Sequence, residues 1–414
     1  MQNEYYNPIK IAVIGGGAAG MMAAGTAISY GAEVTIFEAT DRLGKKLAIT
    51  GKGRCNVTNN CSREEFMEAV TKNPRFLYAA LSAFSTEDTM NFFESMGVPL
   101  KTERGRRVFP VSEKAIDVVK ALRSYSSSAK VIYKKVKTIE KTDEGFKVTA
   151  ENEKHDFDKV IIATGGKSYP LTGSDGSGYR LAMKLGHSVT ELIPSLIPLT
   201  SDSPLCSEMQ GLSLKNVKIS IKDEADKVLY TDFGEMMFAH FGVTGPVILS
   251  ASAHVRSMDI SRLRLSIDLK PALDEKTLDA RILSDFAKKS NKDFINALDD
   301  LLPSKMIEPF VSLTGIDGRK KVNVITKEER KVILNTFKAF EISLSGLRPI
   351  EEAIVTSGGI EVKEITPKTM ESKLHSGLYF CGEVIDVDAY TGGYNLQIAF
   401  STGYLAGKNA AEGF

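Results

Sequence analysis

The feature that most constrains the fold is a glycine-rich turn near the N-terminus, between a short hydrophobic run and an alanine-rich stretch. Gly15, Gly17 and Gly20 fit the G-x-G-x-x-G pattern. In that pattern the first glycine makes a tight turn, the second lets the backbone approach a pyrophosphate, and the third allows close packing of helix on strand. The turn follows a strand-like run and opens a helix-like run, which is the context that supports dinucleotide binding.

A second strand-like run, residues 34–37, ends at Glu38. A carboxylate at this place accepts hydrogen bonds from a ribose diol, and the N-terminus of the helix expected at 18–28 offers N–H groups and a positive dipole to phosphates. The order strand, glycines, helix, strand and acid therefore predicts that the chain binds an adenine dinucleotide. A glycine-rich turn in an unrelated α/β domain is the alternative, and the complete order disfavours it.

Composition limits the partners. The 414 residues suffice for two or three domains, and a net charge of +1 provides no basic field for nucleic acid or an anionic membrane. The uncharged stretch 11–32 is rich in glycine and alanine and begins with the phosphate-binding turn, so we interpret it as neither a membrane span nor a signal peptide. We expect a cytoplasmic protein with a small-molecule substrate and no nucleic-acid or membrane partner. Four cysteines without a C-x-x-C pair, and five scattered histidines, predict no metal site. The oligomeric state stays open.

Hydrophobic periodicity divides the chain into zones. The expected domains are a discontinuous nucleotide-binding domain at 1–190 and 345–414, a β-rich inserted domain at about 191–273 and 341–365, and a helical domain at 274–340. In the first zone we expect helices at about 63–84, 86–96 and 113–125, and strands at 131–133, 136–142, 145–150 and 159–164. Near the end we expect a strand–turn–strand at 353–356 and 360–365.

A basic, glycine-rich loop directly follows Glu38. Its cations are Arg42, Lys45, Lys46, Lys52 and Arg54. Arginine and lysine neutralise phosphate charge and glycines let the chain pass close by, so the loop suits a diphosphate. A solvated surface loop is the alternative. The position of the loop, immediately after the ribose-binding acid, favours the functional interpretation.

Two further clusters stand at strand ends. One hydrophobic strand ends at Thr164-Gly165-Gly166, where the glycines allow a cofactor to lie against the strand. Another ends at Gly382-Glu383, and the glycine pair 392–393 then opens a final alanine-rich helix. A carboxylate there can hold sugar-alcohol hydroxyls, and a helix N-terminus can face a carbonyl that becomes anionic on reduction. A flavin has both groups, so these clusters indicate FAD.

Together the motifs resemble those of the bacterial FAD-binding oxidoreductases that include aminoacetone oxidase and 3-dehydro-bile-acid reductase. The segments that carry the resemblance, spread over the whole chain, are Gly44–Leu47, Thr50–Asn59, Ala163–Gly166, Glu235–Pro246 and Cys381–Gln397. The resemblance implies an α/β fold in which a glutathione-reductase-type, Rossmann-like FAD domain carries an inserted β-rich domain and a small helical domain.

The residues expected to contact FAD come from these clusters and from the resemblance. They are Gly15, Gly17, Ala18, Ala19, Gly20, Glu38, Ala39, Arg42, Lys45, Lys46, Arg54, Cys55, Asn56, Val136, Thr164, Gly165, Gly166, Gly382, Glu383, Asp386, Gly393, Tyr394, Asn395, Leu396 and Gln397.

The side chains considered for catalysis are His240, Tyr390 and Tyr394, with Tyr169 as a further candidate. His240 stands where glycine and proline break the chain after a strand-like run. An imidazole with its usual pKa near 6.5 suits a general acid, and a packed histidine that orients a turn is the alternative. Tyr390 and Tyr394 flank the glycine pair, where they would line the pocket or serve as packing aromatics.

Cys55 and Cys61 form the one cysteine pair that invites a redox interpretation. Their spacing is one residue longer than that of the redox pair in flavin disulfide reductases, and the sequence context differs. A redox-active dithiol is therefore disfavoured. We interpret Cys55 as a loop residue near the cofactor.

We therefore expect an FAD-dependent oxidoreductase that transfers hydride through flavin N5 to or from a small organic substrate. NADH or NADPH is the expected electron donor, and because no second glycine fingerprint occurs, the donor would dock transiently at the flavin. One alternative is an oxygen-using amine or alcohol oxidase of the aminoacetone oxidase type. Another is a non-catalytic flavin-binding protein, such as a redox sensor or an assembly partner of RNA-modifying machinery. The sequence does not choose between C=C reduction and amine or alcohol oxidation.

Overall fold

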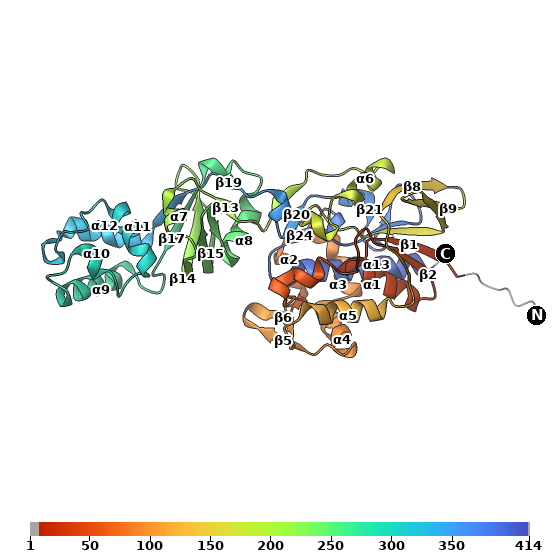
Figure 1. Ribbon diagram of the computed structural model, residues 1–414, viewed down its shortest axis with the longest axis horizontal. Helices are drawn as coiled ribbons and strands as arrows, with labels where there is room; N and C mark the ends of the chain where they lie inside the picture. Colours follow the sequence, from red (N-terminus) through yellow and green to blue (C-terminus); the bar gives the residue numbers. More distant parts are fainter. Residues whose placement is uncertain (1–7, 413–414) are drawn as a thin grey trace, which may run out of the picture. The chain divides into compact units, whose positions relative to one another are not determined.

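The computed structural model describes residues 8–412 and divides into two compact units (Figure 1). The first unit contains the chain up to Pro194 together with the chain from Ile350 onward, and the second contains Ser195–Pro349. The nucleotide-binding zone is therefore interrupted by an insert, and residues 350–365 belong to the first unit.

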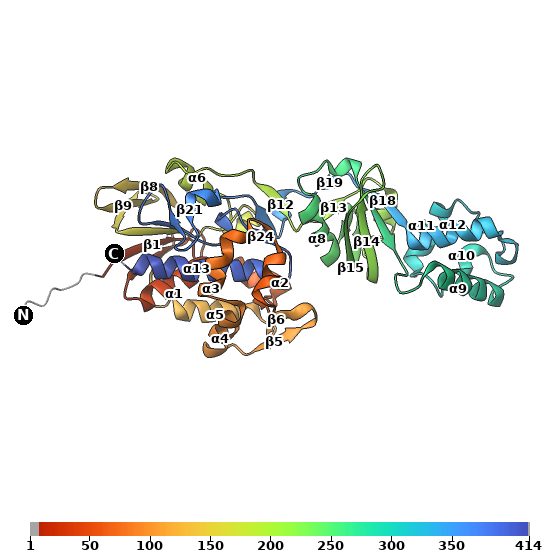
Figure 2. The same cartoon turned by 180° about the vertical axis from the view of Figure 1, so that it is seen from behind.

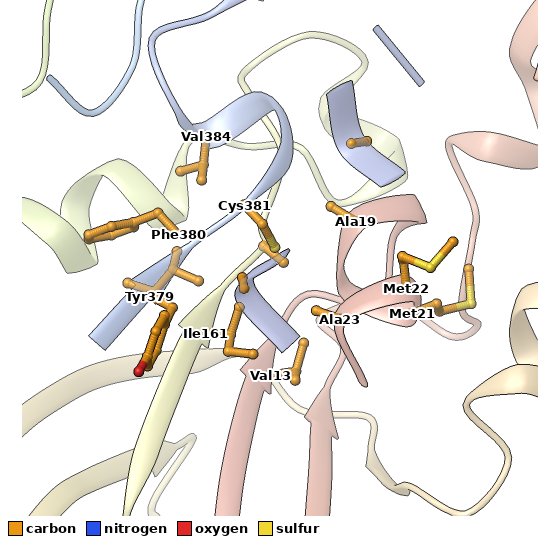
Figure 3. Packing of buried hydrophobic residues seen from close by; sticks show 14 of the residues in the cluster. Val13, Ala19, Met21, Met22, Ala23, Ile161, Tyr379, Phe380, Cys381 and Val384 are labelled. Atoms are coloured by element: carbon orange, nitrogen blue, oxygen red, sulfur yellow. The ribbon is translucent and has the colours of Figure 1, made fainter. Parts of the chain in front are cut away.

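The first unit is built on a sheet in which five consecutive strands, ending at an edge strand, are parallel. In spatial order they are β23 (Leu378–Phe380), β11 (Lys159–Ile162), β1 (Lys10–Ile14), β2 (Glu33–Phe37) and β7 (Lys130–Ile132). Strands β1, β2 and β11 are buried after their first residue and β23 is buried throughout, because both faces of the sheet are covered there. Figure 3 shows Ala23 of helix α1 (Ala18–Ser29) beside strand residues Val13 and Ile161 in this core. The expected Rossmann-like α/β fold is confirmed.

Helix α1 packs along the C-terminal helix α13 (Tyr394–Ala411), as both views show (Figures 1 and 2). A Cβ at Gly403 would lie 2.5 Å from the Ala19 carbonyl oxygen, and one at Gly407 would overlap that of Ala23. Four residues further along α13, the contact moves four residues further along α1, from Ala19 to Ala23, so the two helices run parallel. At 1.5 Å per residue, α13 begins roughly 12 Å before α1 along their common direction. The N-termini of α1 and α13 are therefore two separate sites along the common axis of the helix pair.

The expected helix at 63–84 is wrong. The chain forms α2 (Arg63–Glu68), β4 (Val70–Lys72), a short 3-10 turn and α3 (Tyr78–Ala83) instead. Strand β4 pairs with the remote strand β24 (Asp388–Ala389), and Pro74 disfavours helical backbone at the residue before it. A tertiary pairing and a proline thus override the helical pattern.

The other predicted elements of the first unit are confirmed within about two residues, apart from the strand at 360–365. That segment forms a 3-10 turn at Val362–Glu364 and only the two-residue strand β21. The remaining helices and strands are β3 Thr58–Asn59, α4 Thr86–Ser95, β5 Leu100–Glu103, β6 Arg107–Pro110, α5 Ala115–Tyr125, β8 Val136–Thr142, β9 Gly145–Ala150, β10 Glu153–Phe157, α6 Ser177–Lys184, β20 Val355–Ser357, β21 Ile365–Thr366 and β22 Glu371–Ser372, with β12 Ile193–Ser195 at the boundary between the units.

The second unit combines an antiparallel sheet with helices around one hydrophobic core. Its strands are β13 Leu199–Thr200, β14 Ser213–Lys222, β15 Val228–Ala239, β16 Gly242–Thr244, β17 Arg264–Asp268, β18 Phe340–Ser343 and β19 Gly346–Leu347. Its helices are α7 Pro204–Glu208, α8 Pro246–Val255, α9 Glu275–Lys288, α10 Phe294–Ala297, α11 Ser304–Thr314 and α12 Lys327–Lys338. The helical stretch 274–340 shares this core with the β-rich stretch, so the structure groups the two expected insert domains in one unit. Among residues 8–412, no helix is long and apolar enough to cross a membrane.

Candidate functional site

The three fingerprint glycines of the turn after β1 differ in their surroundings: Gly15 and Gly20 are tightly packed, and Gly17 is not. Gly15 has a φ of +107°, and a Cβ there would lie 2.5 Å from the Ala163 carbonyl oxygen. A Cβ at Gly20 would overlap the Gly15 carbonyl oxygen, so both glycines are required by the packing of the protein itself. A Cβ at Gly17 would meet no protein atom within 4 Å. Gly17 therefore borders open space, as expected where a ligand approaches the backbone.

The start of α1 is suited to an anion. Gly17 is the N-cap residue, its position provides no side-chain cap, and the first turn contains no acidic residue. The N–H groups of Ala18, Ala19 and Gly20 lie ahead of the first intrahelical bond, which Met21 N–H makes to Gly17 O. These N–H groups and the helix dipole favour negative charge at this point.

Glu38 lies buried at the end of β2, next to this turn. Its Oε2 accepts a hydrogen bond from Gly16 N–H at 2.9 Å, and its Oε1 accepts from the backbone and hydroxyl of Thr40, each at 2.8 Å. The carboxylate is thus fixed beside the helix start, where a ribose would lie. Two other predicted contacts, Ala39 and Arg42, are exposed on the following loop, and Val136 is buried at the start of β8.

The basic loop contains cations that already have protein partners. Lys45 pairs with Asp41 at 3.1 Å, and Lys46 and Arg54 have partners in other segments of the first unit. Arg54 contacts Glu103 at 2.6 Å and Glu113 at 3.0 Å, and its guanidinium lies 4.3 Å from the centre of the Phe109 ring. Both carboxylates come from the β5–β6 region, so the sequence pattern of the loop alone could not show them. The charge of Arg54 is therefore balanced within the protein, and its buried Nε is left without a hydrogen-bond partner.

Lys46 and Glu383 meet from opposite ends of the chain. Lys46 Nζ lies 2.9 Å from Glu383 Oε2 and donates to Ser168 Oγ at 2.8 Å. Glu383 Oε1 accepts the N–H of Thr356 at 2.9 Å. A Cβ at Gly166 would lie 2.7 Å from Glu383 Oε1, which explains the glycine at that strand end. The structure thus joins three of the predicted clusters, and it adds Ser168 and Thr356, which sequence reasoning missed as site residues.

The start of α13 is framed by segments distant in sequence. The N-cap residue Gly393 has a φ of +97°, and a Cβ there would overlap the carbonyl of Thr58. Asn59 Nδ2 donates to Gly392 O and to Gly105 O, both at 3.1 Å. Thr58 and Asn59 therefore hold the glycine pair in place. They belong to the motif Thr50–Asn59, but no residue pattern marked them as contacts of the second turn.

Three other predicted contacts hold the protein around this turn. Asn395 accepts from Ala389 N–H at 3.0 Å and donates back to Ala389 O at 2.8 Å, which clamps the preceding loop. Gln397 is fully buried, and its amide bonds Thr58, Ser401 and backbone carbonyls, so its side chain has no free group for a flavin. Asp386 pairs with Lys72 at 2.8 Å. These side chains position the start of the helix.

Four buried polar atoms of the predicted contact residues have no hydrogen-bond partner, namely Arg54 Nε, Asn56 Oδ1, Thr164 Oγ1 and Asp386 Oδ1, the last of which has its ion pair with Lys72. Buried polar atoms in native proteins are normally paired, so each of the other three indicates a partner that binds there. With the open face at Gly17 and two uncapped helix starts, the residues fit FAD. The start of α1 would hold the pyrophosphate, Glu38 the adenosine ribose, and the start of α13 the flavin end.

The family model described as "HI0933-like protein Rossmann domain" matches residues 9–409. The chain belongs to this family. The resemblance found from the motifs is thereby confirmed, and the protein is an FAD-dependent oxidoreductase.

Proteins similar to this one in sequence or in structure match nearly the whole chain. The 3-dehydro-bile acid delta(4,6)-reductase of Clostridium scindens is 31% identical and covers 97% of this chain and 99% of its own. The ribosomal RNA dihydrouridine synthase of Escherichia coli is 28% identical over 96% of each chain. A solved 3-ketosteroid-delta4-(5alpha)-dehydrogenase from Rhodococcus jostii is 16% identical, covers 99% of this chain and 98% of its own, and has a TM-score of 0.55, which shows a shared fold.

The catalytic candidates come from both units, three from the first and His240 from the second. Tyr394 begins α13, and its ring meets the Phe66 ring edge-on at 5.3 Å. Tyr390 is partly buried on the loop before it, whereas Tyr169 is exposed beside a 3-10 turn. His240 lies exposed in the second unit, at the turn between β15 and β16. Tyr394 is thus the candidate that the structure places directly at a helix start of the predicted cofactor site.

The two cysteines of the basic loop are free thiols. Cys55 is fully buried, and burial raises its pKa to about 12. Burial, with Glu65 nearby, raises the pKa of Cys61 to about 11. Both sulfurs are therefore protonated near neutral pH, which is the opposite of the thiolate that disulfide exchange needs.

Proposed function

We propose that this protein is an NAD(P)H-linked reductase that saturates a C=C bond conjugated to a carbonyl in a small organic molecule. When bound, FAD accepts hydride from a nicotinamide and delivers it to substrate from N5. Overall, the nicotinamide loses one hydride, the C=C bond gains that hydride and one proton, and the carbonyl is retained.

The observation that carries this proposal is Tyr394 at the start of α13. A tyrosine phenol holds its proton near neutral pH, and burial raises the pKa of this hydroxyl further, to about 12. Addition across a C=C bond needs a proton donor, whereas oxidation of an amine or an alcohol needs a group that removes one. A protonated phenol beside the flavin end therefore favours reduction.

The names of the relatives support the same bond type. A delta(4,6) 3-dehydro compound has C=C bonds conjugated to its oxo group, and dihydrouridine is uridine whose ring C=C bond, conjugated to a ring carbonyl, is saturated. Both activities deliver hydrogen to a bond of this kind. We propose a small-molecule substrate instead of RNA. Acidic and basic residues are almost balanced, at a net charge of +1, which gives no strong attraction for a polyanion.

The nicotinamide donor would dock at the flavin end of the first unit. The second unit is built on an antiparallel sheet, not on the parallel order that binds dinucleotides. A transient donor that leaves before substrate enters is consistent with this arrangement.

The test is an absorbance spectrum of the purified protein followed by anaerobic stopped-flow titration with NADPH and NADH. Rapid bleaching of bound flavin, then reoxidation by a conjugated enone such as a 4-ene-3-oxo steroid, would support the proposal. Flavin that stays oxidised with both nicotinamides but bleaches with an amine or an alcohol would replace the reductase with an oxidase. Flavin that responds to no donor would favour a non-catalytic role.

The role of Tyr394 has its own control. Tyr394→Phe should lower the enone-dependent reoxidation rate by about 100-fold, the usual size of one general-acid contribution, and leave reduction by nicotinamide unchanged. Tyr133→Phe, at an exposed tyrosine of the first unit, is the control and should retain the rate. Equal rates in both variants would remove Tyr394 as the proton donor.

A further inference from the structure

An exposed arginine cluster lies at the tip of the hairpin formed by β5 and β6 (Figure 2). The connecting residues are Arg104, Gly105 and Arg106, and Arg107 begins β6. We call Arg104, Arg106 and Arg107 the arginine tip. All three are exposed to solvent. Gly105 and Arg106 both have positive φ, of +74° and +57°, so the tip has a defined turn conformation.

One side chain connects this tip to the predicted flavin end. Asn59 Nδ2 donates both to Gly105 O in the tip and to Gly392 O before α13, each at 3.1 Å. The start of α1, which would hold the FAD pyrophosphate, lies roughly 12 Å further along the helix pair. The charge of the tip would therefore lie beside the flavin end and away from the phosphates of FAD.

Two of the three guanidiniums have no carboxylate partner in the described part of the chain. Arg106 pairs with Glu65. Arg107 uses Nε to bond Arg104 O at 3.0 Å, and Arg104 makes no side-chain bond or ion pair within residues 8–412. The nearby acids Glu103 and Glu113 are already held by Arg54 and by Lys101. The tip thus keeps an excess of positive charge after the local ion pairs are formed.

We propose that the arginine tip binds the phosphates of the nicotinamide donor while its ring reaches the flavin. This inference rests on the proposed function. A nicotinamide dinucleotide has its phosphates one ribose away from the reacting ring, so an anion site beside the flavin end matches its shape. Guanidinium groups bind phosphate through paired N–H donors, which suits Arg104 and Arg107. The group bound at the tip would be the pyrophosphate, which NADPH and NADH share.

The experiment compares wild-type holoenzyme with the double variant Arg104→Gln/Arg107→Gln. We expect the Kd for NADP⁺, measured by perturbation of the flavin spectrum, to rise about tenfold, as does the NADPH concentration that gives half-maximal flavin reduction. The limiting rate of reduction and the flavin content should not change. The matched control is Lys137→Gln, an exposed cation on β8. Raising salt should weaken NADP⁺ binding to the wild type more than to the double variant.

The outcomes separate the two proposals. If NADPH and NADH both fail to reduce wild-type flavin, the proposed function fails. If NADPH reduces the wild type and the double variant binds NADP⁺ equally well, the tip assignment alone is overturned. A double variant that loses affinity for an RNA oligonucleotide but keeps its affinity for NADP⁺ would also overturn it, in favour of a nucleic-acid surface.

Discussion

The two helix starts of the first unit look alike in sequence and are built in different ways. Both α1 and α13 begin after glycines, without a side-chain cap and without an acid in the first turn. At the start of α1 the turn packs mainly on its own segment, with Gly20 on Gly15, and the remote Ala163 bounds Gly15 from outside. The start of α13 is assembled from remote segments, in which Gly393 packs on Thr58 and Gly392 is held by Asn59. Local sequence therefore specifies most of the first anion position and a smaller part of the second.

The largest effect on stability and FAD binding is expected at the N-terminus of α1. Gly20→Val would place a branched side chain against the Gly15 carbonyl and should destabilise the fold by more than about 3 kcal/mol, with loss of FAD. Gly17→Ala is the matched change, because its Cβ meets no protein atom within 4 Å. It should leave the melting temperature nearly unchanged and weaken FAD binding. Thermal unfolding and flavin content measure the two effects, and equal melting temperatures in both variants would contradict the assignment.

The second start is tested by Gly393→Ala. The residue has a φ of +97°, and its Cβ would overlap Thr58, so we expect a loss of roughly 2–4 kcal/mol in unfolding free energy. Gly53→Ala is the control, since Gly53 also has positive φ, of +84°, but its Cβ meets nothing within 4 Å. It should lose only about 1 kcal/mol from the backbone conformation. Urea unfolding distinguishes the two, and a similar loss in both would mean that the contact with Thr58 contributes little.

A smaller effect is expected for the side chain that holds the glycine pair. Asn59→Ala removes two hydrogen bonds, to Gly392 and to Gly105, and should cost about 1–3 kcal/mol. It should also lower FAD affinity, because the turn before α13 is then free to move. Asn60→Ala changes an exposed neighbour whose amide contact is 3.5 Å long, and it should do neither. Unchanged FAD affinity in the Asn59 variant would show that the turn is held by other contacts.

The contrast between the helix starts also explains what the sequence could predict. The strand, glycine and helix order around Gly15 depends on neighbours in the chain, so its geometry follows from the pattern. The partners of Arg54, which are Glu103 and Glu113, come from a hairpin about 50 residues away, where no local pattern connects them. The break of the expected helix at 63–84 has the same cause, since β4 pairs with a strand near the C-terminus. Prediction fails where a residue is positioned by chain that is distant in sequence.

The smallest effect is expected away from both helix starts, at His187 after α6. The ring is buried, with Nδ1 3.0 Å from Glu364 Oε2 and Nε2 2.9 Å from Ser372 Oγ. Burial lowers the pKa of this imidazole, an effect that Glu364 opposes and the neighbouring His375 reinforces. The folded protein therefore takes up a proton less readily than the unfolded chain, whose histidine pKa is about 6.5. The stability that His187 contributes is present above that pH and is lost as the pH falls through the folded pKa.

His187→Gln should therefore flatten the fall in stability that sets in as the pH drops below about 6.5, the pKa of histidine in the unfolded chain. Melting temperatures measured across this range test the prediction, with His240→Gln as the exposed histidine control. Because His187 contacts neither helix start, FAD affinity at neutral pH should match that of the wild type. A variant that loses FAD at neutral pH would show instead that the sheet edge near β22 supports the cofactor site, and that the second helix start depends on still more of the distant chain than its direct contacts reveal.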